Sequence, residues 1–246
     1  MYILAIETTG PYGSVALINE KREILGHEVS MDNMSHLKDL MPMIQRMMET
    51  LGISGKDLSA IACDVGPGSF TGIRIGVSTA RALAQVWDLP CVSVSSLTSV
   101  TYKADTGLFP GKDPVVSMII NARRKQIYGF IDGYLKEGPW MIGDAVRIVK
   151  EEIRGERPVL FFGDGVDSYS GILEEELGGP GSIYGFAPEE VRYQDAREIA
   201  LAGLDKFLRG ETLGHRELLP EYMREAEAET KLKAGELPIS RLPRQE

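Results

Sequence analysis

The sequence has no long hydrophobic run and very little cysteine. None of its apolar segments reaches the ~20 residues that a membrane helix needs, so we expect no membrane association. Cys63 and Cys91 both lie in apolar segments, which favours buried free thiols in a reducing cytoplasm over a disulfide. The apolar start MYILAIETTG is short and has no basic leader, so it predicts a first strand rather than a signal peptide.

Basic residues are outnumbered by acidic ones, 27 to 36. The 246 residues carry a formal net charge of −9. A chain of this charge repels phosphate backbones, so we do not expect it to bind nucleic acid over a broad surface by itself. If it serves RNA, we expect it to do so beside a more basic partner.

Histidine is rare and dispersed. His27, His36 and His215 are far apart, and no two of them have the spacing of a metal site on one helix. This pattern argues against a metallopeptidase, and the sequence assigns neither metal ligands nor a catalytic residue. His36 stands at the start of a methionine-rich helix, where we expect it to cap the helix or to contact a partner.

The order of predicted elements defines the fold class. We expect strands at 1–7, 13–19 and 22–30, a helix at 34–51, a strand at 59–65, a helix at 70–87 and a strand at 90–96. The second half has strands at 115–122 and 126–134, helices at 144–153 and 168–177 around a strand at 158–162, and a last helix at 195–210. This order predicts an α/β protein with mixed sheets flanked by helices.

The same pattern suggests two lobes. The first is predicted at 1–105, and a smaller second lobe at 106–220, with the boundary near the Gly-, Pro- and Asp-rich segment DTGLFPGKD. The last helix is a candidate for packing back on the first lobe. Residues 221–246 are mostly charged or small and predict a loosely attached tail.

Residues 66–72, GPGSFTG, join a predicted strand to a predicted helix. Glycines allow close approach of an anion, and the unpaired N–H groups of a helix start attract it, so a phosphate loop is one interpretation. The simpler alternative is a turn capped by Ser69 or Thr71. The segment has no lysine after the glycines and its serine is displaced from a G-x-S-x-G pattern, so it is neither a P-loop nor a nucleophile elbow.

Three further polar loops follow predicted strands: ETTGPYGS (7–14), NARRKQ (121–126) and FFGDGVDSY (161–169). We expect them to surround one cleft together with the glycine loop. The candidate phosphate-binding residues are Glu7, Thr8, Thr9, Gly10, Gly66, Gly68, Ser69, Thr71 and Gly72. A kinase would use Glu7, Asp64 and Asp164 for magnesium and general base chemistry.

Two helices carry unusual faces. The helix at 34–51 has a continuous apolar seam that exceeds what one sheet face requires, and the helix at 70–87 repeats small residues every four positions. Core packing and contact with another protein explain the first of these faces equally well, but the two faces together favour a docking surface for another protein. The candidate interface comprises Met34, His36, Leu37, Leu40, Met41, Ile44, Met48, Gly72, Arg74, Gly76 and Ala80.

Several segments resemble one family over most of the chain, to about Arg224: ILAIETTGPYGSVAL, MSHLKDLMPMI, GPGSFTGIRIG, VSSL, NARRKQIYGF and LPEYMR. They are similar to the bacterial tRNA threonylcarbamoyladenosine biosynthesis proteins of the TsaB family. The resemblance implies the two-lobed actin, sugar-kinase and Hsp70-like ATPase fold with RNase H-like lobes. It also implies a non-catalytic scaffold or activator that binds the catalytic subunit TsaD, so that threonylcarbamoyl passes from threonylcarbamoyl-adenylate to the adenosine next to the anticodon.

The resemblance has further implications for partners and cofactors. It implies a TsaE-like ATPase in the same complex, a homodimer when the chain is alone, contact with tRNA only through the complex, and a cytoplasmic location. The family places the metal-binding histidines in TsaD, and the corresponding segment here, SSLTSVTYKAD (95–105), has none. We expect this chain to require no cofactor, and ATP or ADP at the interface with TsaD is left open. The alternative is a small-molecule kinase or ATPase of the same fold.

Overall fold

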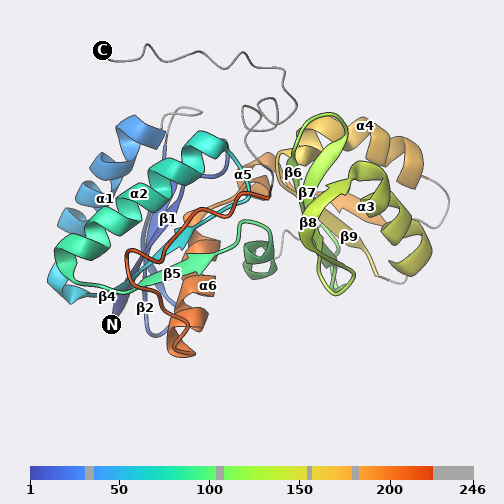
Figure 1. The fold of residues 1–246 in the computed structure, drawn as a ribbon. Coiled ribbons are helices and arrows are strands. Elements are labelled where there is room, and N and C mark those ends of the chain that lie inside the picture. Colours follow the sequence, from blue (N-terminus) through green and yellow to red (C-terminus); the bar gives the residue numbers. More distant parts are fainter. Residues whose placement is uncertain (31–35, 104–107, 154–156, 179–182, 224–246) are drawn as a thin grey trace, which may run out of the picture.

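The computed structural model describes residues 1–30, 36–103, 108–153, 157–178 and 183–223 as two lobes, each built on a five-stranded mixed sheet (Figure 1). The first sheet contains β1 (Tyr2–Glu7), β2 (Ser14–Asn19), β3 (Ile24–Val29), β4 (Leu58–Asp64) and β5 (Cys91–Val94), in the order β3-β2-β1-β4-β5. The second contains β6 (Val115–Asn121), β7 (Gln126–Ile131), β8 (Leu135–Met141), β9 (Val159–Phe162) and β10 (Tyr184–Phe186), in the order β10-β9-β6-β7-β8.

The two lobes repeat one topology. Each begins with three antiparallel strands and then adds two strands parallel to the first, so β1–β5 correspond in order to β6–β10. In the first lobe α1 (His36–Leu51), the short η1 (Gly55–Asp57) and α2 (Phe70–Trp87) connect the later strands. In the second lobe α3 (Ile142–Ile148), its π-helical continuation η3 (Val149–Ile153) and α4 (Gly165–Leu177) do so. The predicted fold class is confirmed.

The first sheet is buried on both faces. Leu4 and Ile6 of β1 pack against α1 and α2, whereas Ile3 and Ala5 on the opposite face pack against α6 (Ala196–Leu208). All four side chains are inaccessible to solvent. Strands covered on both sides lose the polar alternation of a half-exposed strand, which explains the continuous apolar run at the start of the chain. The last helix therefore completes the first lobe, although it follows the second in sequence (Figure 1).

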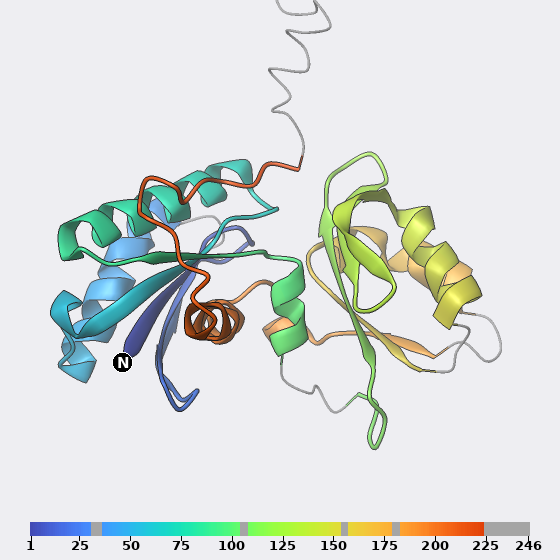
Figure 2. The same ribbon diagram turned by 60° about the horizontal axis from the view of Figure 1, so that its bottom comes forward.

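The second sheet also has two covered faces. One face packs against α3 and α4, and the other packs against η2 (Thr98–Tyr102), which lies between the lobes in Figure 2. The four-residue α5 (Glu189–Arg192) follows β10. The edge strand β8 was not predicted, because its Gly138 and Pro139 are unfavourable inside a central strand but tolerated at an edge.

The apolar seam of α1 is core. Leu40, Met43, Ile44, Met47 and Met48 are at most 8% exposed and share a core with the first sheet, so the assignment of Leu40, Ile44 and Met48 to a partner surface is wrong. A helix that must cover a fully buried sheet needs a broad stripe, which is what the extra methionines supply. Met41 alone, of the seam residues whose side chains are described, is strongly exposed, at 47%. Met34 and the side chains of His36 and Leu37 lie outside the described residues.

The row of small residues on α2 also packs inside the chain. Gly72, Gly76 and Ala80 are buried, and a Cβ atom on Gly72 would lie 1.9 Å from the carbonyl oxygen of Thr8. A Cβ atom on Gly76 would lie 2.3 Å from Oγ1 of Thr8. The small residues therefore let α2 approach the end of β1, and their assignment to a partner interface is wrong.

The segment after α6 returns across the first lobe. Leu213 pairs with Cys91 through two backbone hydrogen bonds of 2.8 Å, and Leu218 is fully buried. The backbone N–H of Glu221 donates to the carbonyl oxygen of Val65 at 2.8 Å. Residues 221 and 222, which the sequence placed in a loose tail, thus contact the folded lobe, and 224–246 lie outside the described residues.

The prediction that both cysteines are buried free thiols is confirmed. Cys63 and Cys91 are free and fully buried. Across the described ranges, no helix combines the length and apolar character that spanning a bilayer requires.

We predict that Gly72→Ala destabilises the protein. Alanine usually favours a helix over glycine by up to ~1 kcal/mol, but here its methyl group would collide with backbone, so we expect a net loss of about 1–3 kcal/mol in the free energy of unfolding. Urea denaturation measures the change, with Ser78→Ala on the exposed side of the same helix as the control. Equal stability of Gly72→Ala and the wild type would contradict this packing.

Candidate functional site

Four loops, two from each lobe, meet at one cleft of about 490 Å³. Its lining includes Thr9, Gly10 and Pro11 after β1, Gly68, Ser69 and Phe70 before α2, Asn121, Ala122 and Arg123 after β6, and Asp164 before α4. The loops after β1 and β6 occupy equivalent places in the two lobes, as do the loops after β4 and β9. The structure thus brings together the four polar loops that the sequence placed around one cleft.

The glycine loop packs tightly on the turn after β1. The N–H of Ser69 donates to the carbonyl oxygen of Thr9 at 2.8 Å, and a Cβ atom on Gly68 would lie 2.5 Å from that oxygen. Oγ1 of Thr8 donates to the carbonyl oxygen of Gly72 at 2.7 Å. Gly68 and Gly72 therefore serve contacts within this chain.

The start of α2 has its own cap. Oγ of Ser69 accepts a hydrogen bond from the N–H of Gly72 at 3.2 Å, as in the simpler of the two interpretations of this loop. Thr71, the other cap candidate, is exposed on the first turn. Gly66, the first residue of this loop, has φ of +110°. Ser69 and Phe70 remain in the wall of the cleft.

Two carboxyl groups are buried beneath Thr9 and Gly10, which form the floor of the cleft. Glu7 and Asp64 have no solvent exposure. Oε1 of Glu7 accepts hydrogen bonds from Oγ1 of Thr9 at 2.6 Å and from the N–H of Gly10 at 3.0 Å. Oδ1 of Asp64 accepts from Oγ of Ser96 at 2.6 Å and from the N–H of Gly66 at 2.8 Å. Oγ1 of Thr9 lies 3.1 Å from Oδ2 of Asp64, so Thr9 joins the two acids in one network.

Burial governs the charge of this pair. Loss of solvent, followed by the nearby charge of Asp64, raises the pKa of Glu7 well above its usual value, and burial raises the pKa of Asp64. Two neighbouring buried carboxyl groups cannot both ionise without a large cost. Oε2 of Glu7 has no hydrogen-bond partner in the structure, which suits a protonated acid better than a carboxylate.

The three acids considered for magnesium are not equivalent. Glu7 and Asp64 are closed off from the cleft, whereas Asp164 lines it from the second lobe and accepts a hydrogen bond from the N–H of Asn121 at 2.9 Å. Burial also raises the pKa of Asp164. The described residues contain no group of three or more His, Cys, Asp or Glu side chains that could hold a metal ion.

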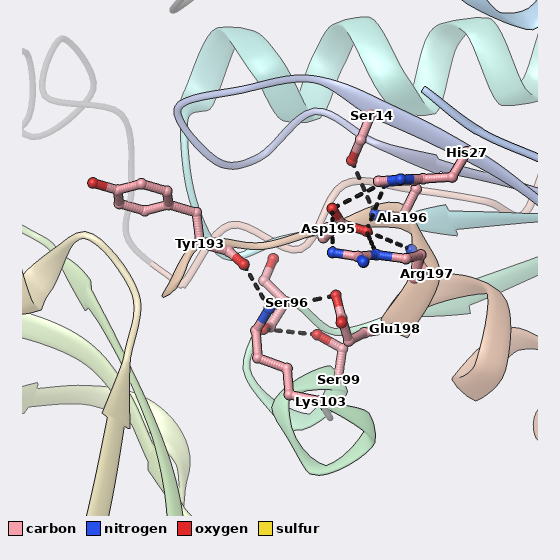
Figure 3. Close-up of polar contacts among 10 residues, drawn as sticks. All are labelled: Ser14, His27, Ser96, Ser99, Lys103, Tyr193, Asp195, Ala196, Arg197 and Glu198. Atoms are coloured by element: carbon pink, nitrogen blue, oxygen red, sulfur yellow. Dashed lines mark hydrogen bonds and ion pairs between the residues drawn. The ribbon is translucent and has the colours of Figure 1, made fainter. Parts of the chain in front are cut away.

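A buried ion pair ties the two segments that cross between the lobes (Figure 3). Nζ of Lys103, just after η2, lies 3.4 Å from Oε2 of Glu198 in α6 and donates to the carbonyl oxygen of Tyr193 at 2.7 Å. Both charged side chains are less than 10% exposed. Asp195 caps α6 and lies 3.0 Å from Nε2 of His27, so this histidine has a structural contact.

The loop NARRKQ forms a strained basic turn at the rim of the cleft. Arg123, Arg124 and Lys125 are all exposed and have φ of 64°, 52° and 62°. Each residue other than glycine in this left-handed region costs on the order of 1–3 kcal/mol. The sequence indicated a tight turn here, but not that three consecutive bulky side chains adopt this conformation.

Sequence reasoning missed two parts of the site. Ser96 bonds Asp64 and lies near Thr9, and its position directly after an apolar strand was the available signal. Lys103 and Glu198 are 95 positions apart, and no local pattern distinguishes them from exposed charges.

We predict that Glu7→Gln removes a pH dependence of stability. Because the pKa of Glu7 is higher in the folded than in the unfolded protein, its contribution to stability is present at low pH and is lost as pH rises from about 5 to 8. The wild type should therefore lose stability relative to Glu7→Gln by up to about 1.4 kcal/mol per pH unit. Denaturation at several pH values tests this, with the exposed Glu175→Gln as the control. A difference that does not vary with pH would contradict it.

Comparison with known proteins places this geometry in a family. The sequence model of TsaD, tRNA N6-adenosine threonylcarbamoyltransferase, matches residues 24–232. The chain is 33% identical to the tRNA threonylcarbamoyladenosine biosynthesis protein TsaB of Bacillus subtilis (strain 168), over 94% of this chain and 97% of that protein. It is 30% identical to the protein of the same name from Escherichia coli (strain K12), over 96% of this chain and 100% of that protein.

Solved structures agree at the level of the fold. A protein from Pseudomonas aeruginosa, described as uncharacterized with similarity to peptidase YeaZ, superposes with a TM-score of 0.72 at 22% identity, over 91% of this chain and 99% of its own. A second structure, YeaZ from the same organism, has a TM-score of 0.67 at 21% identity. With relatives aligned over nearly their whole length, the chain belongs to the TsaB family of tRNA threonylcarbamoyladenosine biosynthesis proteins.

Proposed function

We propose that this chain is a non-catalytic subunit of a cytoplasmic tRNA threonylcarbamoyl transferase. It binds a TsaD-like catalytic subunit, which transfers threonylcarbamoyl from threonylcarbamoyl-adenylate to the adenosine next to the anticodon. The observation that carries this proposal is the closed floor of the cleft. Glu7 and Asp64 are inaccessible, and the glycine loop is occupied by backbone of the same chain. A transferase needs reacting groups that touch the substrate, and these do not.

The docking surface in this proposal is the outer face of α1 and α2, which lie side by side in Figure 1. Arg74, Ser78 and Ala82 are exposed and recur every four residues, on the side of α2 opposite the buried glycines. Small exposed side chains let a partner helix approach closely, and the flexible side chain of Met41 adapts to a partner surface. A homodimer through this surface forms in the absence of the catalytic subunit, and a TsaE-like ATPase joins the complete complex.

A nucleotide site is a separate part of the proposal. The start of α2 contributes Gly68, Ser69 and Phe70 to the cleft, and a helix start favours a phosphate group. Because backbone of the same chain already contacts Gly68 and Gly72, this chain alone offers only an incomplete nucleotide site. ATP or ADP would therefore bind where the catalytic subunit adds further contacts.

The alternative is a small-molecule kinase or ATPase. It is favoured by Asp164, a buried acid that lines the cleft and whose pKa is raised, as in many general bases. It is disfavoured by the inaccessibility of the two other acids.

We predict that Ser78→Trp combined with Ala82→Trp abolishes co-purification with the TsaD-like subunit. Two indole rings on the proposed surface would hold the partner helix away, while the exposed positions leave the fold intact. Thermal denaturation checks the fold, and threonylcarbamoyl transfer in the reconstituted mixture should fall in parallel. Glu174→Trp on the exposed face of α4 is the matched control. Full binding by the double variant would exclude this surface.

We predict that isothermal calorimetry with ATP and Mg²⁺ gives no heat for the chain alone and measurable binding for the complex. The reason is that Glu7 and Asp64 are inaccessible to Mg²⁺, and contacts within the chain already occupy Gly68 and Gly72. Turnover of ATP by the isolated chain with a sugar or carboxylate acceptor would support the kinase alternative. Absence of heat in both samples would remove the nucleotide from the proposal.

A further inference from the structure

The turn between β6 and β7 concentrates positive charge in an acidic protein. Arg123, Arg124 and Lys125 are consecutive and exposed, whereas the net charge of the chain is −9. Within the described part of the chain, these three side chains form no ion pair with an acid. Most other described arginines do, namely Arg22, Arg46, Arg147, Arg157, Arg192, Arg197 and Arg209. The turn, which we call the basic tip (residues 123–125), therefore presents three uncompensated cations.

The basic tip is held rigidly. Oδ1 of Asn121 accepts from the N–H of Arg123 at 2.8 Å and from the hydroxyl of Tyr169 at 3.0 Å. The carbonyl oxygen of Arg123 accepts from the N–H of Gln126 at 2.9 Å. The carbonyl oxygen of Lys125 accepts from the N–H of Ile142 at 3.0 Å. Contacts with β7 and with the starts of α3 and α4 thus fix the backbone that carries the cations.

The conformation of the tip is costly for its residues. All three have φ between 52° and 64°, where glycine or asparagine would be accommodated more easily. An observed outlier of this kind motivates a functional hypothesis. Glycine and asparagine carry no charge, so neither residue could present cations at these positions.

The tip also has a defined place. It occupies in the second lobe the position that the turn after β1 occupies in the first, and Arg123 lines the cleft between the lobes. A ligand that follows the rim of the cleft would meet the tip.

The chemistry of the tip fits phosphodiester groups better than a protein surface. Arginine and lysine are the side chains that most often neutralise nucleic acid phosphates, and a rigid set of cations fixes the register of the strand. Arginine is also frequent in protein interfaces, but there it accompanies aromatic and other apolar anchors, and residues 123–125 supply none. The family acts in the modification of a tRNA.

We propose that the basic tip binds the phosphate backbone of tRNA within the proposed complex, so that this subunit positions the substrate although it does not react with it. The inference rests on the proposed function, because the catalytic subunit must bring the tRNA to this side of the chain. Three phosphate contacts contribute to affinity without reading sequence.

The experiment compares two triple variants in the complete complex with the TsaD-like and TsaE-like subunits and full-length tRNA. The first carries Arg123→Asn, Arg124→Asn and Lys125→Asn, because asparagine removes the charge and tolerates the left-handed conformation. The second carries Lys56→Asn, Lys112→Asn and Lys136→Asn, three exposed lysines elsewhere, and has the same net charge. Co-purification and thermal denaturation establish assembly and folding of both.

We expect the tip variant to weaken tRNA binding about tenfold at low salt and to reduce the slope of log K against log salt by about 2–3. In transfer assays the KM for tRNA should rise with kcat nearly unchanged, and the matched variant should resemble the wild type. Unchanged affinity and slope, or equal losses in both triple variants, would overturn the inference. Loss of assembly by the tip variant alone would also overturn it and assign the tip to protein contact. Failure of the wild-type chain to assemble would instead refute the proposed function, and the inference with it.

Discussion

The close contact between the start of α2 and the turn after β1 is the constraint on which the rest of the first lobe depends. Gly68 and Gly72 let the backbone of Thr8 and Thr9 approach to distances that no side chain would allow. This contact fixes the direction of α2 and places Thr9 above the two buried acids. The floor of the cleft is consequently made of backbone and hydroxyl groups, with the acids beneath it.

This arrangement separates the two lobes in chemical character. In the first lobe the polar groups at the strand ends bond one another, and little of their capacity for binding remains accessible. In the second lobe the equivalent turn directs its charge to solvent. A duplicated topology therefore supports two roles, one structural and one suited to binding.

The elements with strong periodicity could be predicted from the sequence, and so could the order that defines the fold. The grouping of the polar loops also followed, because corresponding strand ends meet at one side of the sheets. The faces of α1 and α2 were misassigned, because apolar width or small size indicates close packing but not which surface is packed. The strand β8 could not be predicted because its Gly138 and Pro139 are typical of a loop. The ion pair of Lys103 and Glu198 could not be predicted because only the folded structure brings these two residues together.

The position of α6 has a consequence for the order in which the protein is made. The rear of the first sheet is covered by a helix that the ribosome adds only after the whole second sheet has been synthesised. Until then Ile3, Ala5 and their neighbours on that face have no partner, although they are the first residues to emerge. The second lobe, whose helices α3 and α4 lie within its own contiguous segment, can finish folding earlier. A nascent chain can thus complete its second sheet, with α3 and α4 on it, before α6 covers the rear face of the first sheet.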